Sequence, residues 1–207
     1  MRSEDSRATT NALAARLGVE AASVTGMLKK LAELKLVDYV PYQGAQLTLG
    51  GERIALEVIR HHRLIELYLI EAMGYTWDQV HAEADRLEHA ISEEFEDRIA
   101  RILGDPKTDP HGDPIPSKDG EVARSSRMSL ADSPVNHRVR IQRVRDEDPQ
   151  LLRLLANLGL LPQTIVHVCA AQNDPAKILI RHEDGNTHAL DRAVAESVYV
   201  VDVPPSA

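Results

Sequence analysis

The sequence predicts a mainly α-helical first part followed by a small all-β barrel. Apolar residues recur at helical spacing over most of residues 10–103, with one strand-like interruption near residue 40. Residues 104–136 are rich in Pro, Gly and Asp, which is typical of loops and linkers. Five short β-rich runs with one inserted helix follow, and a barrel of about 70 residues fits this pattern.

The composition indicates a globular protein of a reducing compartment. The chain has 207 residues, enough for one large domain or two small ones with real cores. Its single cysteine, Cys169, excludes a disulfide framework, and we expect it to be buried on a strand rather than to bind a ligand. There is no run of about 18 apolar residues, and "MRSEDSRATT" lacks a signal-peptide core. We therefore expect a soluble, cytoplasmic protein without a membrane partner.

Charge is distributed unevenly along the chain. The formal net charge of −8 on its own disfavours nucleic acid as a partner. Residues 1–63, however, hold nine Lys or Arg against seven Asp or Glu, whereas the remainder holds 15 against 25. A mildly basic head and an acidic body can meet different partners.

Residues 9–50 have the pattern of a winged helix-turn-helix. "TTNALAARLGV" begins with threonines that can cap a helix, spaces its leucines on one face and stops at Gly18. "EAASVTGMLKKLAELKLV" follows with a second apolar stripe, and two short helices joined by a Gly-containing turn are typical of a helix-turn-helix. "VDYVPYQGAQLTLG" alternates, turns near Gln43 and alternates again, which predicts a wing-like hairpin.

This module predicts binding to double-stranded DNA. The exposed residues at the start of the second helix, which begins near Glu20, are small and allow close approach to the major groove. The lysines further along that helix and the polar start of the first helix can contact phosphates, although each alone can equally be a solvated charge or a cap. The weak positive charge predicts a homodimer on a palindromic operator. The predicted contact residues are Thr10, Asn11, Ala22, Ser23, Thr25, Gly26, Lys29, Lys30 and Gln43.

Three helices are expected between the hairpin and the linker. They cover residues 51–72, roughly 76–90, and 92–103, the last of them capped by Ser92. The apolar surfaces of the second and third helices are the expected dimer interface.

Two of these helices carry a candidate metal site. One presents four ligand-type side chains at i, i+4, i+7 and i+8, which share a helical face, and the preceding helix presents a His/Glu pair at i, i+4. One such pair alone is more often a solvated ion pair, but two clusters on consecutive helices favour a divalent cation, whose charge cancels the repulsion among three carboxylates. The residues are His81, Asp85, Glu88 and His89 on the one helix, and His62 and Glu66 on the other.

The ligand set indicates the kind of ion and argues against catalysis. Imidazole and carboxylate without Cys or Met suit Mn²⁺ or Fe²⁺, one or two per subunit, better than a soft metal. A di-metal oxidase on paired helices would need Glu-x-x-His twice, whereas Glu88 and His89 are adjacent and no second copy exists in the sequence. We therefore expect neither an enzyme nor a small organic substrate.

Residues 9–120 resemble the diphtheria toxin repressor family of metal-dependent iron and manganese regulators. The helix-turn-helix, the wing, "HHRLIEL", "VHAEADRLEH" and "PHGDPIP" follow in the family's order, and the H-x-E-A-x-x-x-E-H pattern is quite specific. "LGLLPQTIVHV" and "LDRAVAESVYV" resemble that family's SH3-like domain, which is related to the small domain of ferrous-iron transport accessory proteins.

The resemblance implies a domain organisation and a function. It implies a DNA-binding domain over residues 1–50, a metal-binding and dimerisation domain over 51–120, a linker over 121–133 and an SH3-like domain over 134–207. It also implies a metal-dependent transcriptional repressor of metal homeostasis genes. Because manganese-selective members have a carboxylate where iron-selective members have Cys, Asp85 favours Mn²⁺ over Fe²⁺.

The family's two metal sites can be carried onto this chain by position. In the family, the ancillary site takes ligands from both helices and can also take a Glu and a Gln from the SH3-like domain. The ligands of the primary, activating site that match here begin at Asp85 on the second helix. The ancillary matches are His62, Glu66, His81, Glu147 and Gln150, and the primary matches are Asp85, Glu88 and His89.

The start of the chain departs from the family's pattern. The family has a further helix before its helix-turn-helix, which supplies the remaining primary ligands, whereas Met1 stands only eight residues before Thr9. Glu4 or Asp5 would have to substitute for those ligands. An alternative hypothesis is therefore a shortened module that dimerises and binds metal without binding DNA independently.

Overall fold

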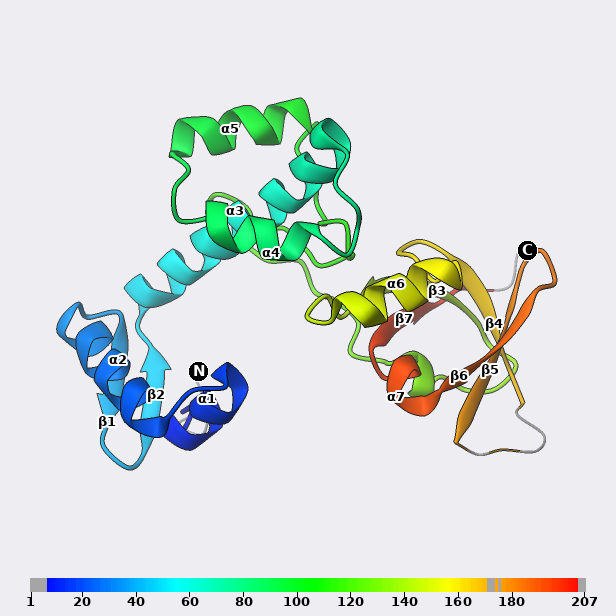
Figure 1. Cartoon of the computed structure of the whole chain (residues 1–207), viewed down its shortest axis with the longest axis horizontal. Coiled ribbons are helices and arrows are strands. Elements are labelled where there is room, and N and C mark those ends of the chain that lie inside the picture. The colour runs from blue at the N-terminus through cyan, green and yellow to red at the C-terminus, as the bar shows by residue number, and fades with distance from the viewer. Residues whose placement is uncertain (1–6, 171–173, 175, 205–207) are drawn as a thin grey trace. The chain divides into compact units, whose positions relative to one another are not determined.

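The computed structural model describes residues 7–170, 174 and 176–204 of the chain (Figure 1). The chain divides into two compact units, Met1–Val58 and Ile59–Ala207. None of the helices in the described ranges is long and apolar enough to span a membrane. The predicted substitutes for primary-site ligands, Glu4 and Asp5, lie outside the described residues.

The first unit is a winged helix-turn-helix, as predicted. The hydroxyl of Thr9 accepts a hydrogen bond from the amide of Ala12 and caps the first helix, which ends at the left-handed Gly18. A small apolar core, which includes Val24 and Leu28, joins the helices to the hairpin. The elements are α1 (Thr10–Leu17), α2 (Ala21–Glu33), β1 (Val37–Val40) and β2 (Gly44–Leu47), and the two strands pair antiparallel.

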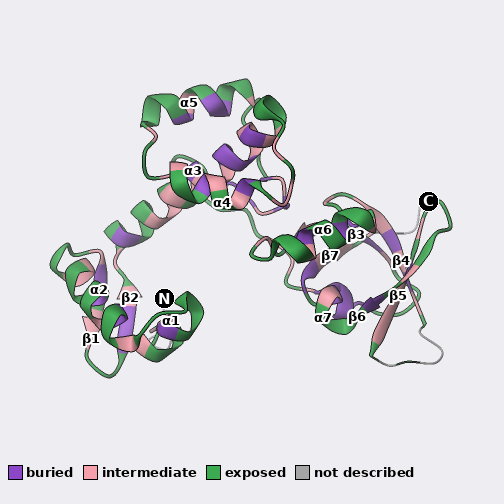
Figure 2. Cartoon of the chain, viewed as in Figure 1, coloured by how far each residue is buried: buried purple, intermediate pink, exposed green. Residues whose placement is uncertain are grey.

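Three helices follow. The first of them, α3, begins in the first unit and continues into the second. Leu64 of α3 packs with α5, and Ile65 and Leu69 of the same helix pack with α4 (Figure 2), so α3 lies between two apolar cores. The hydroxyl of Ser92 accepts a hydrogen bond from Phe95 and caps α5, as predicted. The helices are α3 (Leu49–Met73), α4 (Val80–Leu87) and α5 (Glu93–Ile102).

The middle helix is shorter than the predicted range of 76–90 at both ends. Before α4, Trp77 leaves the helical path, packs against the core of the C-terminal barrel, and donates a hydrogen bond from Nε1 to the carbonyl of Pro110. After α4, Glu88 is the cap residue and His89 lies beyond the helix. Glu88 and His89 are therefore held by the end of a helix rather than by its face.

The C-terminal part is a five-stranded antiparallel sheet in the order β6-β5-β4-β3-β7, which confirms the small SH3-like fold. Its buried aliphatic core gathers residues of every strand, such as Ile141, Val166 and Ile180. The sequence did not predict the short helix before the last strand. The elements are β3 (Arg138–Val144), α6 (Pro149–Asn157), β4 (Ile165–Cys169), β5 (Lys177–His182), β6 (Thr187–Asp191), α7 (Arg192–Ala195) and β7 (Val198–Asp202).

The Pro- and Gly-rich stretch after α5 is a loop, as predicted, but its centre is not solvated. Asp109, His111 and Ile115 are buried, and His111 is fully enclosed. A short 3-10 helix, Leu130–Asp132, precedes the barrel. The loop is thus a packed part of the second unit.

Candidate metal centre

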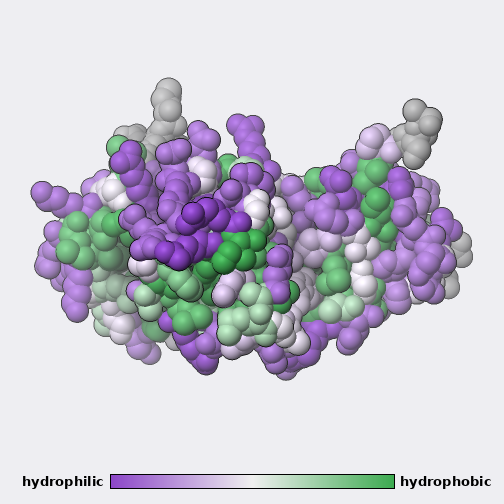
Figure 3. All heavy atoms as spheres, turned by 90° about the horizontal axis from the view of Figure 1, so that it is seen from above, coloured by the Kyte–Doolittle hydropathy of each residue, from purple (hydrophilic) through white to green (hydrophobic). Residues whose placement is uncertain are grey.

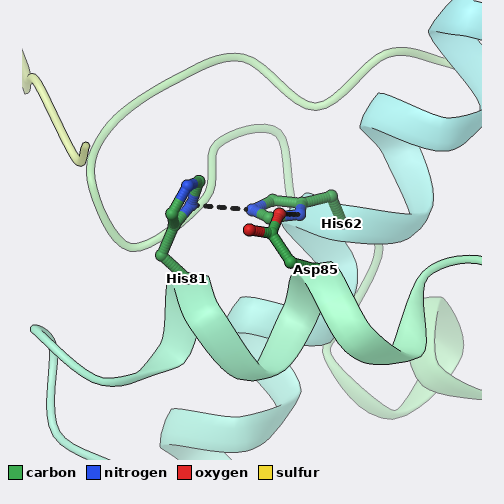
Figure 4. A group of neighbouring side chains, drawn as sticks. All are labelled: His62, His81 and Asp85. Atoms are coloured by element: carbon green, nitrogen blue, oxygen red, sulfur yellow. Dashed lines mark hydrogen bonds and ion pairs between the residues drawn. The ribbon is translucent and has the colours of Figure 1, made fainter. Parts of the chain in front are cut away.

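His62 of α3 and His81 and Asp85 of α4 point toward one another (Figure 4), and their ligand atoms lie within 4.8 Å of one another. Glu66 of α3 lies against the two histidines. His62 Nε2 lies 3.0 Å from Glu66 Oε1 and 3.0 Å from His81 Nδ1. His81 Nδ1 in turn lies 3.2 Å from the same carboxylate oxygen. Glu66 is completely buried, so its charge faces these imidazoles rather than water.

The second ring nitrogen of His62 faces the other predicted ligands. His62 Nδ1 lies 2.7 Å from Glu88 Oε2 and 3.4 Å from Asp85 Oδ1. His89 Nε2 lies 3.2 Å from Glu88 Oε1, and its side chain is 70% exposed. The structure therefore brings all six predicted helical ligands into one chain of contacts, with His62 at its centre.

A second, buried group of donors lies beside this cluster. Ligand atoms of Glu66, His111 and Asp146 lie within 4.8 Å of one another. His111 Nδ1 is 3.8 Å from Glu66 Oε2 and 3.9 Å from Asp146 Oδ2, and Asp146 Oδ2 is also 3.8 Å from His81 Nδ1. Neither of these candidate ligands, His111 and Asp146, was predicted from the sequence.

The donor atoms of this buried group fit a cation. His111 Nε2 lies 3.0 Å from the carbonyl of Trp77 and donates to it, so in the neutral ring the lone pair is on Nδ1. His111 Nδ1 and Glu66 Oε2 are buried without a hydrogen-bond partner. Leaving two electron-pair donors unsatisfied is costly, and a divalent cation between them would satisfy both.

Two features of the fold hold Asp146 near the helices. The amide of Val144 donates a 2.9 Å hydrogen bond to the carbonyl of His111. At Gly112, φ is +91° and a Cβ atom would lie 2.0 Å from the carbonyl oxygen of Gln142, so only glycine lets the loop approach β3 this closely. The end of β3 is thereby placed beside the loop, and Asp146 stands two residues after the last residue of β3.

Of the predicted SH3-like ligands, Glu147 is not a member of either close group of His, Asp and Glu ligand atoms among the described residues. The amide of Gln150 donates to the carboxylate of Asp148, the cap of α6. Asp146 is the residue of this segment that the structure places beside His81. Ligation by Glu147 or Gln150 stays a prediction.

Protons and metal ions compete for this centre, because a ligating imidazole must be neutral. Burial lowers the pKa of His62, but hydrogen bonds to Glu66 and Glu88 outweigh it and raise this pKa to about 9. The hydrogen bond to Glu66 raises the pKa of His81 against burial. Burial raises the pKa of Glu66, yet interactions with the surrounding histidines outweigh it and hold this pKa well below its usual range.

Within the first unit, several predicted DNA-contacting residues share one concave surface. A groove of about 440 Å³ lies between the start of α1, α2 and the hairpin, and its lining includes Thr10, Asn11, Thr25 and Lys29. The other predicted residues on α2 (Ala22, Ser23, Gly26 and Lys30) are exposed, as is Gln43 at the hairpin turn. Their contacts with DNA stay predictions.

A winged helix and a nitrogen- and oxygen-donor metal centre in one chain define a metal-responsive DNA-binding regulator. The sequence comparisons agree domain by domain. Residues 1–45 match the N-terminal DNA-binding domain of iron-dependent repressors, residues 48–117 their metal-binding and dimerisation domain, and residues 128–202 the FeoA domain.

Individual relatives show the same relationship. The chain is 31% identical over 197 residues to the iron-dependent repressor IdeR of Mycobacterium leprae, across 88% of this chain and 85% of that protein. It is 26% identical over 190 residues to the diphtheria toxin repressor of Corynebacterium glutamicum, across 86% and 82%. This chain belongs to the iron-dependent repressor family.

Solved structures of similar proteins extend the comparison to the whole fold. A manganese-dependent transcriptional repressor in complex with manganese is 37% identical, with a TM-score of 0.87, across 97% of this chain and 93% of that one. The manganese regulator SloR is 29% identical, with a TM-score of 0.76, across 96% and 92%.

Proposed function

We propose that this protein is a transcriptional repressor whose binding to operator DNA requires a divalent cation, Mn²⁺ first and Fe²⁺ second. The observation that carries the proposal is a pair of buried donors that make no hydrogen bond, His111 Nδ1 and Glu66 Oε2. They lie 3.8 Å apart, next to the convergent histidines, in a chain that also contains a winged helix. The metal-dependent repressors to which the chain is similar support it.

The geometry of His62 supports two ion positions that share the cluster. A neutral imidazole has one lone pair, so His62 can ligate through Nδ1 or Nε2 but not through both. Glu66 and His81 also lie near His111 and Asp146, respectively. Glu88 contacts His62 and the exposed His89, and ligand atoms of Asp85, His62 and His81 lie within 4.8 Å of one another. We assign an outer ion to His62 Nδ1, Asp85, Glu88 and His89, which form the outer group. We assign an inner ion to Glu66, His81, His111 and Asp146, which form the inner group.

The donor chemistry favours Mn²⁺ over softer ions. Both positions offer only carboxylate oxygen and imidazole nitrogen, and the lone cysteine lies on β4 of the barrel, where its Sγ contacts the carbonyl of His167. Hard donors suit Mn²⁺ and Fe²⁺, although Zn²⁺ and Ni²⁺ would still bind by the affinity order of divalent ions. The titration described below compares Mn²⁺ with Fe²⁺, and the ion that induces DNA binding at the lower concentration is the preferred one.

We expect the protein to bind its operator as a homodimer. Phe95 and Ile102 of α5 are 45% and 69% exposed, and hydrophobic residues also reach the surface on the face drawn in Figure 3. The match of residues 48–117 to a dimerisation domain supports an interface there. A twofold dimer would present two recognition helices to two half-sites.

Fluorescence anisotropy with DNA from the protein's own promoter tests the proposal. We expect anaerobic titration with Mn²⁺ or Fe²⁺ to induce binding, and Glu88→Gln to abolish it. Glu83→Gln is the matched control, because Glu83 lies on the same helix and pairs with Arg86 rather than with the centre. Metal-independent binding would contradict the proposal. Metal binding without DNA binding at any concentration would favour the dimerising module instead.

A further inference from the structure

His61, next to the central ligand His62, contacts two other elements. Its Nδ1 lies 3.3 Å from the backbone carbonyl oxygen of Glu88, and its Nε2 lies 2.9 Å from Glu96 Oε2 on α5, within ion-pair distance but not in hydrogen-bond geometry. His61 and Glu96 are only 7% and 4% exposed. The ring therefore bridges the end of α4 and the body of α5 inside the protein.

The contact at Glu88 is suited to fixing that ligand. The last carbonyl groups of a helix have no partner within the helix, and Glu88 is the cap residue of α4. His61 contacts the backbone carbonyl of Glu88, and His62 contacts the carboxylate of Glu88. Glu88 is therefore held at both its backbone and its side chain. The direction of the Glu88 side chain then depends on two neighbouring residues of α3.

The contact at Glu96 ties the same ring to α5. Arg60 Nε donates a 2.6 Å hydrogen bond to Glu96 Oε1, so this buried carboxylate is held by two consecutive residues of α3. Arg60 also donates to the carbonyl of Pro116. His61 is thus the residue that connects Glu96 with the metal ligand, and Arg60 shares only the Glu96 end.

We propose that His61 is a positioning residue: it orients Glu88 for the outer ion and links that ligand through Glu96 to α5. The inference rests on the proposed function, because it assigns Glu88 as a ligand and α5 to the dimer interface. Metal binding and dimerisation are then coupled, and the coupling is reciprocal: the ion tightens the dimer by the same factor by which the dimer tightens ion binding.

Substitutions that keep one ring nitrogen at a time separate the two contacts. In His61→Asn the amide nitrogen takes the place of Nδ1, so contact with Glu88 is kept and contact with Glu96 is lost. In His61→Gln the amide nitrogen takes the place of Nε2, so the reverse holds. His61→Leu removes both, and Arg60→Gln is the matched control for a weakened Glu96 site.

Two measurements on the full chain read these effects. We expect the Mn²⁺ affinity of the monomer, from the electron paramagnetic resonance signal of free Mn²⁺, to fall about tenfold in His61→Gln and His61→Leu and to stay near wild type in His61→Asn. Sedimentation equilibrium should show that Mn²⁺ no longer tightens the dimer in any His61 variant. Arg60→Gln should lower metal-free stability without changing Mn²⁺ affinity.

The outcomes separate this inference from the proposed function. Wild-type Mn²⁺ affinity in all three His61 variants would overturn the positioning role. Equal losses in Arg60→Gln and His61→Gln would also overturn it, because the effect would then belong to the buried Glu96 site as a whole. If the wild-type protein bound neither Mn²⁺ nor Fe²⁺, the proposed function itself would fail.

Discussion

The inner and outer groups of the metal centre use the same kinds of donor but differ in burial. Glu66 and His111 of the inner group are fully enclosed, whereas the side chains of Asp85 and His89 in the outer group are 58% and 70% exposed. The other members are intermediate, with Glu88 12% and His81 33% exposed. Enclosed donors are already desolvated and held by their surroundings. Exposed donors must be ordered when the ion arrives, which costs conformational entropy. The comparison indicates a tight inner position and a weaker, more responsive outer one.

Glu66→Gln should have the largest effect, because Glu66 contacts both groups. We expect the free energy of unfolding without metal to fall by about 3 kcal/mol, since the change removes a buried negative charge facing several imidazoles. Mn²⁺ binding should be lost from the inner position. Urea unfolding in the presence of a chelator measures the first effect. Glu94→Gln, which alters an exposed pair with Arg98, should leave the stability nearly unchanged.

Asp146→Asn tests whether the barrel supplies an inner ligand. We expect the bound Mn²⁺ to fall by one ion per chain, measured by elemental analysis after desalting, while the barrel stays folded. Glu147→Gln is the matched control from the next position. Loss of the ion in Glu147→Gln, and not in Asp146→Asn, would favour the ligand carried over from the family's pattern.

Asp85→Asn should weaken only the outer position. Because this side chain is mostly solvated, we expect metal-free stability to be unchanged while Mn²⁺ affinity falls by at least about tenfold. Isothermal titration calorimetry against Glu83→Gln measures the difference. A large loss of metal-free stability would show that the two groups do not differ as their burial indicates.

The Mn²⁺ affinity should rise gradually with pH, because protons compete with the ion for the histidine nitrogens. Because the pKa of His62 is raised from 6.5 to about 9, its protonated form stabilises the metal-free fold fully below pH 6.5, and this contribution is lost as the pH rises through about 9. Metal binding must release that proton, so Mn²⁺ affinity should rise over the same interval. Proton release measured in buffers of different ionisation enthalpy checks this. A pH-independent affinity between pH 7 and 9 would contradict it.

Elements with local signals could be predicted closely from the sequence. The cap at Thr9, the stop at Gly18 and the alternation on either side of Gln43 are short-range features, and all reappear in the winged helix. The proximity of the six candidate ligands on the two helices could be predicted, because their spacing is itself a sequence pattern.

The inner group could not be predicted in the same way. His111 comes from a loop whose Pro, Gly and Asp content is typical of solvent exposure, and Asp146 stands in an acidic run in which each neighbour is an equal candidate. Their burial and proximity depend on the contact of Gly112 with β3, which is a long-range feature. The shortening of α4 has a similar cause, because Trp77 packs against a barrel formed by residues far along the chain.

Trp77 is also the sole tryptophan of the protein, and its ring lies 5.3 Å from that of His111. Its emission therefore arises beside the proposed inner ligand His111 and at the edge of the barrel core. Mn²⁺ and Fe²⁺ are paramagnetic quenchers, so an ion held by His111 would be expected to quench this single fluorophore. Tryptophan fluorescence would then report the occupancy of the proposed inner position.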